Sequence, residues 1–238
     1  MGRDAGSWAK SGTDLRLKEI PSDAINLNVE GRNVTSPIQG FGKMWQKTYR
    51  VVLGPNVEPA QVVRVWKQHF GDFWPEGNRF YGPLTGIAAG EVALLNLTMP
   101  GKVKLSTGML VLYADEESFT LMTPQGHMFA GWITFSAESS GNGTVAQVQI
   151  LMRASDPLYE LGLAFGGHRK EDKFWNQTLT SLASFFGVQG EVAAGAVCVD
   201  RKRQWKRWKN IYKNAAIRSG MYAAGTPFRR KPKTKASS

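Results

Sequence analysis

Six strand-like segments follow one another between residues 86 and 153, and the links between them are short. Each is rich in β-branched, aromatic or other apolar residues, and turn-forming groups such as Pro124-Gln125-Gly126 separate them. The expected strands are residues 92–98, 103–105, 109–113, 119–123, 131–137 and 145–152. Parallel strands need a crossover of about a dozen residues or more, so strands joined by such links pair antiparallel. We therefore predict a curved antiparallel meander in the middle of the chain.

Further elements flank this meander. Residues 45–53 read as a strand that ends at a Gly-Pro-Asn turn, and residues 58–74 carry apolar side chains at helical spacing. After Asp156-Pro157 a long amphipathic helix is expected, which Gly187 ends. Its apolar stripe consists of Trp175, Leu179, Leu182 and Phe186. The order of elements predicts an α+β fold in which a curved sheet wraps around one long C-terminal helix and leaves an apolar space beside it.

The positive charge of the chain is confined to its end. The 238 residues carry a formal net charge of +11 and are 42% hydrophobic, which is enough for a sizeable core. Residues 1–199 hold 17 Lys and Arg against 18 Asp and Glu, whereas residues 200–238 hold 13 against one. We predict an irregular N-terminal arm at 1–40, a main domain at 41–190, and a linker with a basic aromatic tail at 191–238. Partners of negative charge are expected for the tail alone.

Composition also predicts compartment and cofactors. The only cysteine is Cys198, so an intrachain disulfide is excluded, and the chain shows neither an 18-residue apolar run nor an apolar N-terminal stretch. We expect a cytoplasmic protein. The three histidines are far apart, and the glycine-rich stretches match no phosphate-binding motif. No metal, no cofactor and no catalytic residue is therefore predicted.

The segment from Thr123 to Phe135 reads TPQGHMFAGWITF, and Gly40-Phe41-Gly42 precedes the first strand. These motifs and the order of elements over roughly residues 41–188 resemble the START-like helix-grip superfamily, which includes lipid-transfer and polyketide cyclase-like proteins. The segment is similar to an uncharacterised branch of that superfamily. The resemblance implies an internal cavity for a hydrophobic or lipid-like small molecule, or cyclisation or dehydration chemistry in the same cavity. It implies no fixed catalytic residue.

His127 is the first candidate for contact with such a ligand. A neutral imidazole at a cavity mouth could bind a hydroxyl or carbonyl group or act as a general base. The alternative, which we favour, is a tight hairpin in which the ring hydrogen-bonds to the backbone. Apolar ligand contacts are expected from Phe129, Trp132, Trp175 and Leu179. His168 and Asp172, four residues apart, resemble part of a catalytic pair, but such pairs are common on solvated helix faces, which is the interpretation we favour.

The tail reads RKRQWKRWKNIYK from Arg201 to Lys213, after Asp200 as an expected N-cap. A helix there would place aromatic side chains on one face and lysines beside them. The residues expected to contact a membrane or another anion are Arg201, Lys202, Trp205, Lys206, Trp208, Lys209 and Lys213. Three alternatives are open: docking of the aromatic face on the domain, binding to an anionic membrane surface, and, least favoured, binding to nucleic acid. Residues 229–235 are expected to form a disordered basic end.

The leading functional hypothesis is binding of an apolar small molecule or lipid in the cavity between sheet and helix. A cyclase- or dehydratase-type enzyme that uses His127 as acid or base is the first alternative. A peripheral membrane or nucleic-acid protein that acts through the tail is the second.

Overall fold

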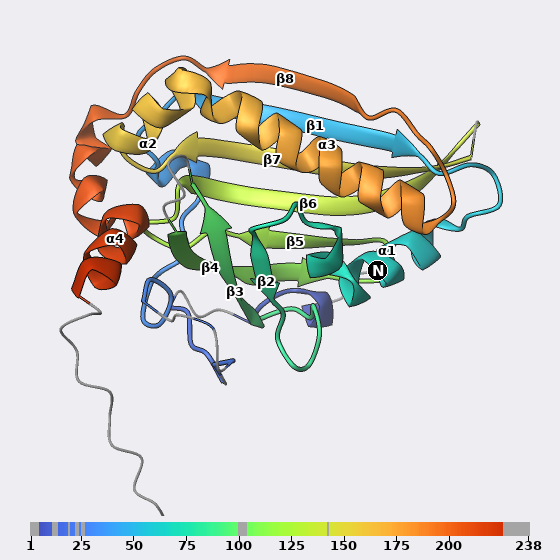
Figure 1. Ribbon diagram of the computed structural model, residues 1–238, viewed down its shortest axis with the longest axis horizontal. Helices are drawn as coiled ribbons and strands as arrows, with labels where there is room; N and C mark the ends of the chain where they lie inside the picture. The colour runs from blue at the N-terminus through green and yellow to red at the C-terminus, as the bar shows by residue number, and fades with distance from the viewer. Residues whose placement is uncertain are drawn as a thin grey trace, which may run out of the picture.

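The computed structural model describes residues 5–10, 14–18, 20–21, 24, 27–99, 104–141 and 143–225. Among these residues, eight antiparallel strands form one sheet in the order β2-β3-β4-β5-β6-β7-β1-β8 (Figure 1). The strands are β1 (Met44–Val52), β2 (Arg79–Tyr81), β3 (Val92–Thr98), β4 (Lys104–Ala114), β5 (Ser118–Met122), β6 (Phe129–Ser140), β7 (Gly143–Ala154) and β8 (Ala193–Asp200).

Helices lie at both ends of the meander. They are the α-helices α1 (Pro59–Gln68), α2 (Pro157–Gly162), α3 (His168–Phe185) and α4 (Ala215–Gly225), the 3-10 helices η1 (Ala5–Ser7), η2 (Pro37–Gln39), η3 (Phe70–Phe73) and η6 (Trp205–Lys213), and the π-helical turn η5 (Leu163–Gly167). The long helix α3 lies across one face of the curved sheet (Figure 1), where it contacts β1 and, through Trp175 and Phe135, also β6. This is the α+β helix-grip arrangement, and the predicted fold class is confirmed.

Two parts of the sheet differ from the expectation. The segments at 103–105 and 109–113 were expected as separate strands, but β4 runs unbroken from Lys104 to Ala114, and residue 103 lies outside the described residues. Residues 193–200, which the sequence analysis assigned to a linker, form β8 at the edge of the sheet, where Ala196 is the register partner of Lys47 on β1. Small residues at 193–196 pack little, so their strand character comes from pairing with β1 and not from an alternating apolar pattern.

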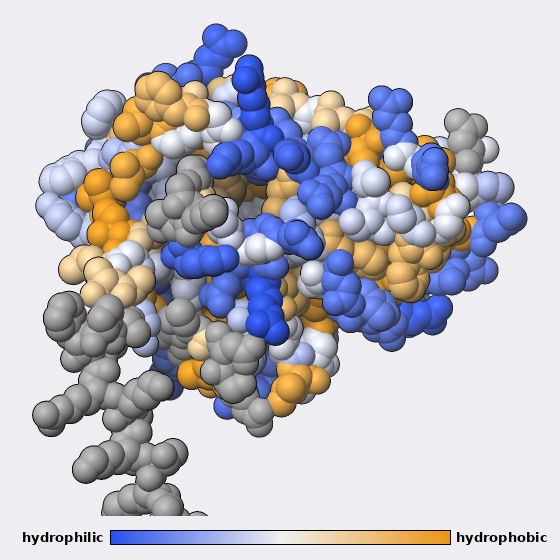
Figure 2. Space-filling model, in the orientation of Figure 1, coloured by the Kyte–Doolittle hydropathy of each residue, from blue (hydrophilic) through white to orange (hydrophobic). Residues whose placement is uncertain are grey.

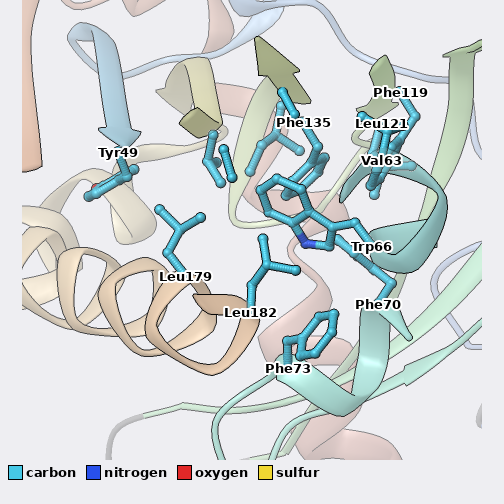
Figure 3. Close-up of a cluster of buried hydrophobic side chains, with 14 of the residues drawn as sticks. Tyr49, Val63, Trp66, Phe70, Phe73, Phe119, Leu121, Phe135, Leu179 and Leu182 are labelled. Carbon is cyan, nitrogen blue, oxygen red and sulfur yellow. The ribbon is translucent and has the colours of Figure 1, made fainter. Parts of the chain in front are cut away.

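An aromatic core fills the space between α1, the second half of α3 and the sheet (Figure 3). Trp66 of α1 is completely buried, and its ring lies 5.2 Å from that of Phe135, which stacks on Phe119 at 4.7 Å. Leu179 and Leu182 of α3 close this cluster from the helix side. Side chains therefore occupy this part of the space where an apolar cavity was expected, and the cavity stays a prediction.

The N-terminal arm covers part of the opposite face of the sheet. Leu15 and Val29 are buried against Leu94 of β3 and Leu110 of β4. Main-chain bonds also hold the arm, for example from the Thr35 amide to the Thr123 carbonyl, at 2.8 Å.

Candidate functional site

The inner side of β1 places charged groups beneath the first half of α3. Alternate residues of a strand point to the same face, so Lys47 and Tyr49 both face the helix. The Lys47 ammonium lies 2.9 Å from Oε2 of Glu171 and 2.7 Å from Oδ1 of Asp172, and the Tyr49 hydroxyl donates to the same Oδ1 at 2.6 Å. We call Lys47, Tyr49, His168, Glu171 and Asp172 the buried polar cluster.

Glu171 and His168 are the members of the cluster whose hydrogen bonding is incomplete. The Glu171 side chain is only 7% exposed, and its Oε1 has no hydrogen-bond partner among the described residues. Nδ1 of His168 lies 4.0 Å from Oε2, too far for a hydrogen bond, and also has no partner there. Buried polar atoms without a partner are rare in folded proteins. The cluster can therefore accept a further polar group.

Burial and neighbouring charges set the proton affinities of the cluster. Burial raises the pKa of Glu171 to about 7, although Lys47 acts in the opposite direction. Burial also acts to raise the pKa of Asp172, but the hydrogen bonds from Lys47 and Tyr49 outweigh it, so this pKa is lowered. Burial, followed by the charge of Lys47, lowers the pKa of His168. At neutral pH the cluster thus holds an ionised Asp172 and a Glu171 that can gain or lose a proton.

Partly buried aromatic rings border the cluster. The ring of Trp45 lies 4.8 Å from that of His168, and Trp175 follows Glu171 by one helical turn. The ring of Trp175 also lies 5.7 Å from Phe135 of the aromatic core. The cluster is therefore a polar spot at the edge of an apolar interior.

The apolar residues predicted to contact a ligand separate into two groups. Trp175, Phe129 and Leu179 all pack in the core between sheet and helix. Trp132 does not, because Ile133 and Phe135 occupy the inner face of β6 and their neighbour Trp132 points to the opposite face. Contact of Trp132 with a ligand between sheet and helix is therefore not supported by its position, and the sequence alone did not tell which face of the strand is buried.

His127 lies inside the β5–β6 connection. Its side chain is buried, and its Nδ1 accepts a hydrogen bond from the Phe129 amide at 3.0 Å. Burial lowers the pKa of the imidazole to about 4. This is the favoured hairpin arrangement, in which the ring hydrogen-bonds to the backbone, whereas a role of His127 in ligand contact stays a prediction.

Sequence reasoning missed Lys47 and Glu171, and it favoured a solvated face for Asp172. A signal was present in the first strand, where Lys47 interrupts the alternating inner residues Trp45, Tyr49 and Val51. Asp172 bonds to β1 instead of only facing solvent, because α3 lies directly on that strand.

The tail is docked on the domain and is not one continuous α-helix. Asp200 is the last residue of β8, where its carboxylate accepts a hydrogen bond from the Lys202 amide at 2.8 Å and pairs with Arg153. Contrary to the expectation, it is therefore not the N-cap of a tail helix. After an extended stretch the chain forms η6 and then α4. The Ala215 amide donates to the Gly126 carbonyl at 2.9 Å. A side chain at residue 126 would collide with the Lys213 carbonyl, so glycine permits this close approach.

The seven residues predicted to contact a membrane or anion all lie on the exposed side of the docked tail: Arg201, Lys202, Trp205, Lys206, Trp208, Lys209 and Lys213. Trp205 is 70% and Trp208 45% exposed.

Between tail and domain lies a polar pocket of about 60 Å³, lined by residues such as Gln39, Gln125 and Asn210. Sites for drug-sized ligands usually measure about 300 Å³ or more, so this pocket is too small for a lipid.

The arrangement of a curved sheet around α3 is similar to that of several solved structures. No family model and no curated protein matches its sequence. A START superfamily protein from Mycobacterium smegmatis shares 18% identity, with 61% of this chain and 98% of that chain covered and a TM-score of 0.42. The di-domain ARO/CYC StfQ from the steffimycin biosynthetic pathway shares 10% identity over 61% of this chain and 51% of that chain, with a TM-score of 0.48.

A third similar structure is the major latex-like protein 151 of Panax ginseng, at 13% identity and a TM-score of 0.42, with 61% of this chain and 99% of that chain covered. Similarity at this level concerns the general fold and not the ligand or the chemistry. Within the described residues, no helix combines the length and the apolar character needed to cross a membrane.

Proposed function

We propose that the protein binds an apolar small molecule carrying a hydroxyl group between the sheet and the first half of α3. The observation that supports this proposal is the buried polar cluster, in which the Glu171 carboxylate keeps an unpartnered oxygen. A buried carboxylate oxygen requires a hydrogen-bond donor, and a ligand hydroxyl supplies one without adding charge. The apolar body of the ligand would lie along Trp45, Phe129 and Trp175.

Room for the ligand must come from side-chain movement at the edge of the core. Trp45 and Trp175 are partly exposed, unlike Trp66 and Phe135. Outward rotation of Trp175 would end its contact with Phe135 but would leave the packing of Trp66 on Phe135 and of Phe135 on Phe119 in place. Affinity then comes from apolar burial, at about 25 cal/mol per Å², and orientation comes from Glu171.

The alternative of a cyclase- or dehydratase-type enzyme with His127 as acid or base has less support. General acid–base catalysis near neutral pH needs a group whose pKa is close to the working pH. Burial instead lowers the pKa of His127 to about 4. The Nδ1 lone pair is also engaged with the Phe129 amide.

Binding is tested with decanol and decane, two ligands that differ in the hydroxyl group. We expect decanol to displace a fluorescent apolar probe from the purified chain more strongly than decane does. Affinity for decanol should rise as the pH passes upward through about 7, because the ionised Glu171 is the better acceptor. Glu171→Met removes the acceptor and should weaken decanol binding about tenfold or more, with loss of the pH dependence.

Glu138→Met, at an exposed position of β6, is the matched control and should bind like the unchanged protein. Circular dichroism verifies that both variants fold. The proposal fails if decanol and decane bind equally, if neither binds, or if the two variants behave alike.

A further inference from the structure

An exposed apolar ridge runs along α2 and η5. Leu158, Leu161 and Phe165 lie at positions i, i+3 and i+7, and their side chains are 45%, 54% and 83% exposed. The opposite side of the same segment is buried, because Tyr159 and Leu163 pack against Ala154. The three exposed residues therefore do not contribute to the core, and their apolar surface faces water.

The backbone of η5 helps to present this ridge. Phe165 leaves the helical conformation with φ −93° and ψ 39°, and Gly166 follows with φ 101°, which glycine adopts readily. The resulting kink lies within η5 and separates α2 from α3. The most exposed ring of the ridge thus lies at the kink.

The docked tail lies beside the ridge at the same end of the molecule (Figure 1). Arg203 Nε pairs with Glu160 Oε1 of α2 at 2.9 Å, and the Ala216 amide donates to the Tyr159 hydroxyl at 3.0 Å. The tail adds its own exposed aromatic and apolar side chains: Trp205, Trp208, Tyr212, Ile217 and Met221. Figure 2 shows apolar surface at this end of the molecule, interspersed with hydrophilic surface.

The charged residues that the tail contributes to this surface are all positive. Residues 201–225 contain eight Lys and Arg and no Asp or Glu. All eight of these cations are exposed, and Arg203 is paired with Glu160. Such a surface combines apolar side chains that favour leaving water with cations that favour a negative partner.

We propose that this end of the protein, formed by α2, η5, η6 and α4, docks on an anionic lipid membrane. Tryptophan and tyrosine prefer the boundary between headgroups and acyl chains, leucine and phenylalanine enter the acyl region, and lysine and arginine contact acidic headgroups. Nucleic acid would use the cations and the aromatic rings. It offers no apolar medium for Leu158 and Leu161, and these residues favour the membrane as the partner.

The test is sedimentation of the full chain with phosphatidylcholine vesicles, with and without phosphatidylserine. We expect binding only when phosphatidylserine is present, and weaker binding as salt increases. The double variant Leu161→Ser and Phe165→Ser, which leaves the charge unchanged, should bind about tenfold more weakly or worse. The double variant Lys206→Glu and Lys209→Glu should also bind about tenfold more weakly or worse.

Matched controls use residues far from this end in the fold. Leu84→Ser changes a side chain that is exposed to the same extent as Phe165, 83%, and Arg64→Glu changes an exposed cation of α1. Both should bind vesicles normally. The proposal is overturned if the controls lose as much binding as the test variants, if vesicles are not bound, or if the ridge variant binds like the unchanged protein. Salt-sensitive binding to an oligonucleotide without binding to vesicles would also overturn it. None of these outcomes depends on whether decanol binds inside the domain.

Discussion

The imidazole of His127 illustrates how the environment of one residue decides its chemistry. In the sequence it stands between a turn and a strand, a position that favours a structural role but also allows contact with a ligand. In the fold the ring is buried, and its Nδ1 accepts a hydrogen bond from the Phe129 amide. Burial lowers the pKa of the ring to about 4. Glu171 shows the converse, since it looks like an ordinary surface residue in the sequence and lies buried beside Lys47 in the fold.

The pKa of His127 predicts how stability responds to acid. Above pH 6.5 the ring is neutral in both the folded and unfolded states. As the pH falls from 6.5 to about 4, the unfolded state binds a proton and the folded state does not, so stability decreases, in total by about 3 kcal/mol. His127→Asn keeps an acceptor for the amide and should lack this loss in urea unfolding measured across pH. His69→Asn, at a side chain 44% exposed, should keep it. Parallel curves for His127→Asn and the unchanged protein would contradict the assignment.

The helices differ in how far their sequence defines them. The apolar period of α3 is long and regular, and the structure buries Leu179 and Leu182 on the expected face. The tail has the same kind of pattern, but it forms η6 and α4 with a break at Asn214. The Asn214 side chain donates to Oδ2 of the buried Asp156 at 2.8 Å and accepts from the Ile217 amide at 3.0 Å. A contact between residues 58 positions apart thus coincides with the point where one helix ends and the next begins.

Asn214 should therefore be important for docking of the tail. Asn214→Ala removes both hydrogen bonds and leaves Asp156 without this donor, which should lower the free energy of unfolding by about 2–4 kcal/mol. Asn214→Asp keeps an acceptor for the Ile217 amide but puts a second carboxylate beside Asp156, so it should be at least as damaging. Urea unfolding measures both, and Lys209→Ala, an exposed change in the same tail, should cost less than about 0.5 kcal/mol. If Asn214→Asp were as stable as the unchanged protein, contact with Asp156 would not hold the tail.

At the scale of the whole molecule, the tail is built into the fold. The amide of Asn28, in the N-terminal arm, donates to the Ser106 carbonyl of β4 at 2.8 Å and to the Ser219 hydroxyl of α4 at 3.1 Å. Arm, sheet and tail therefore share one buried hydrogen-bonded contact. The basic surface is consequently presented by a folded end of the molecule, at least as far as residue 225.

This arrangement predicts the effect of truncation. A chain that ends at Arg203 loses the partners of Asp156, Gly126 and Asn28 in the tail. We expect its free energy of unfolding to be lower by at least about 3 kcal/mol, and its binding of a dye specific for exposed apolar surface to increase. Urea unfolding and dye fluorescence measure the two effects. Stability equal to that of the full chain would contradict the docked arrangement and would support a tail that acts independently.

The amino-acid sequence determined the elements whose signal is local. Short links imposed antiparallel pairing on the meander, and the apolar period indicated α3, because turn chemistry and side-chain periodicity act between near neighbours. Tertiary structure alone decided what depends on distant residues. The strand at 193–200 exists through pairing with β1, Trp132 faces away from α3, and Lys47 meets Glu171 across 124 positions of sequence. Burial and charge pairing depend on which parts of the chain pack against each other in the fold. This packing determines both the buried polar cluster and the exposed basic end.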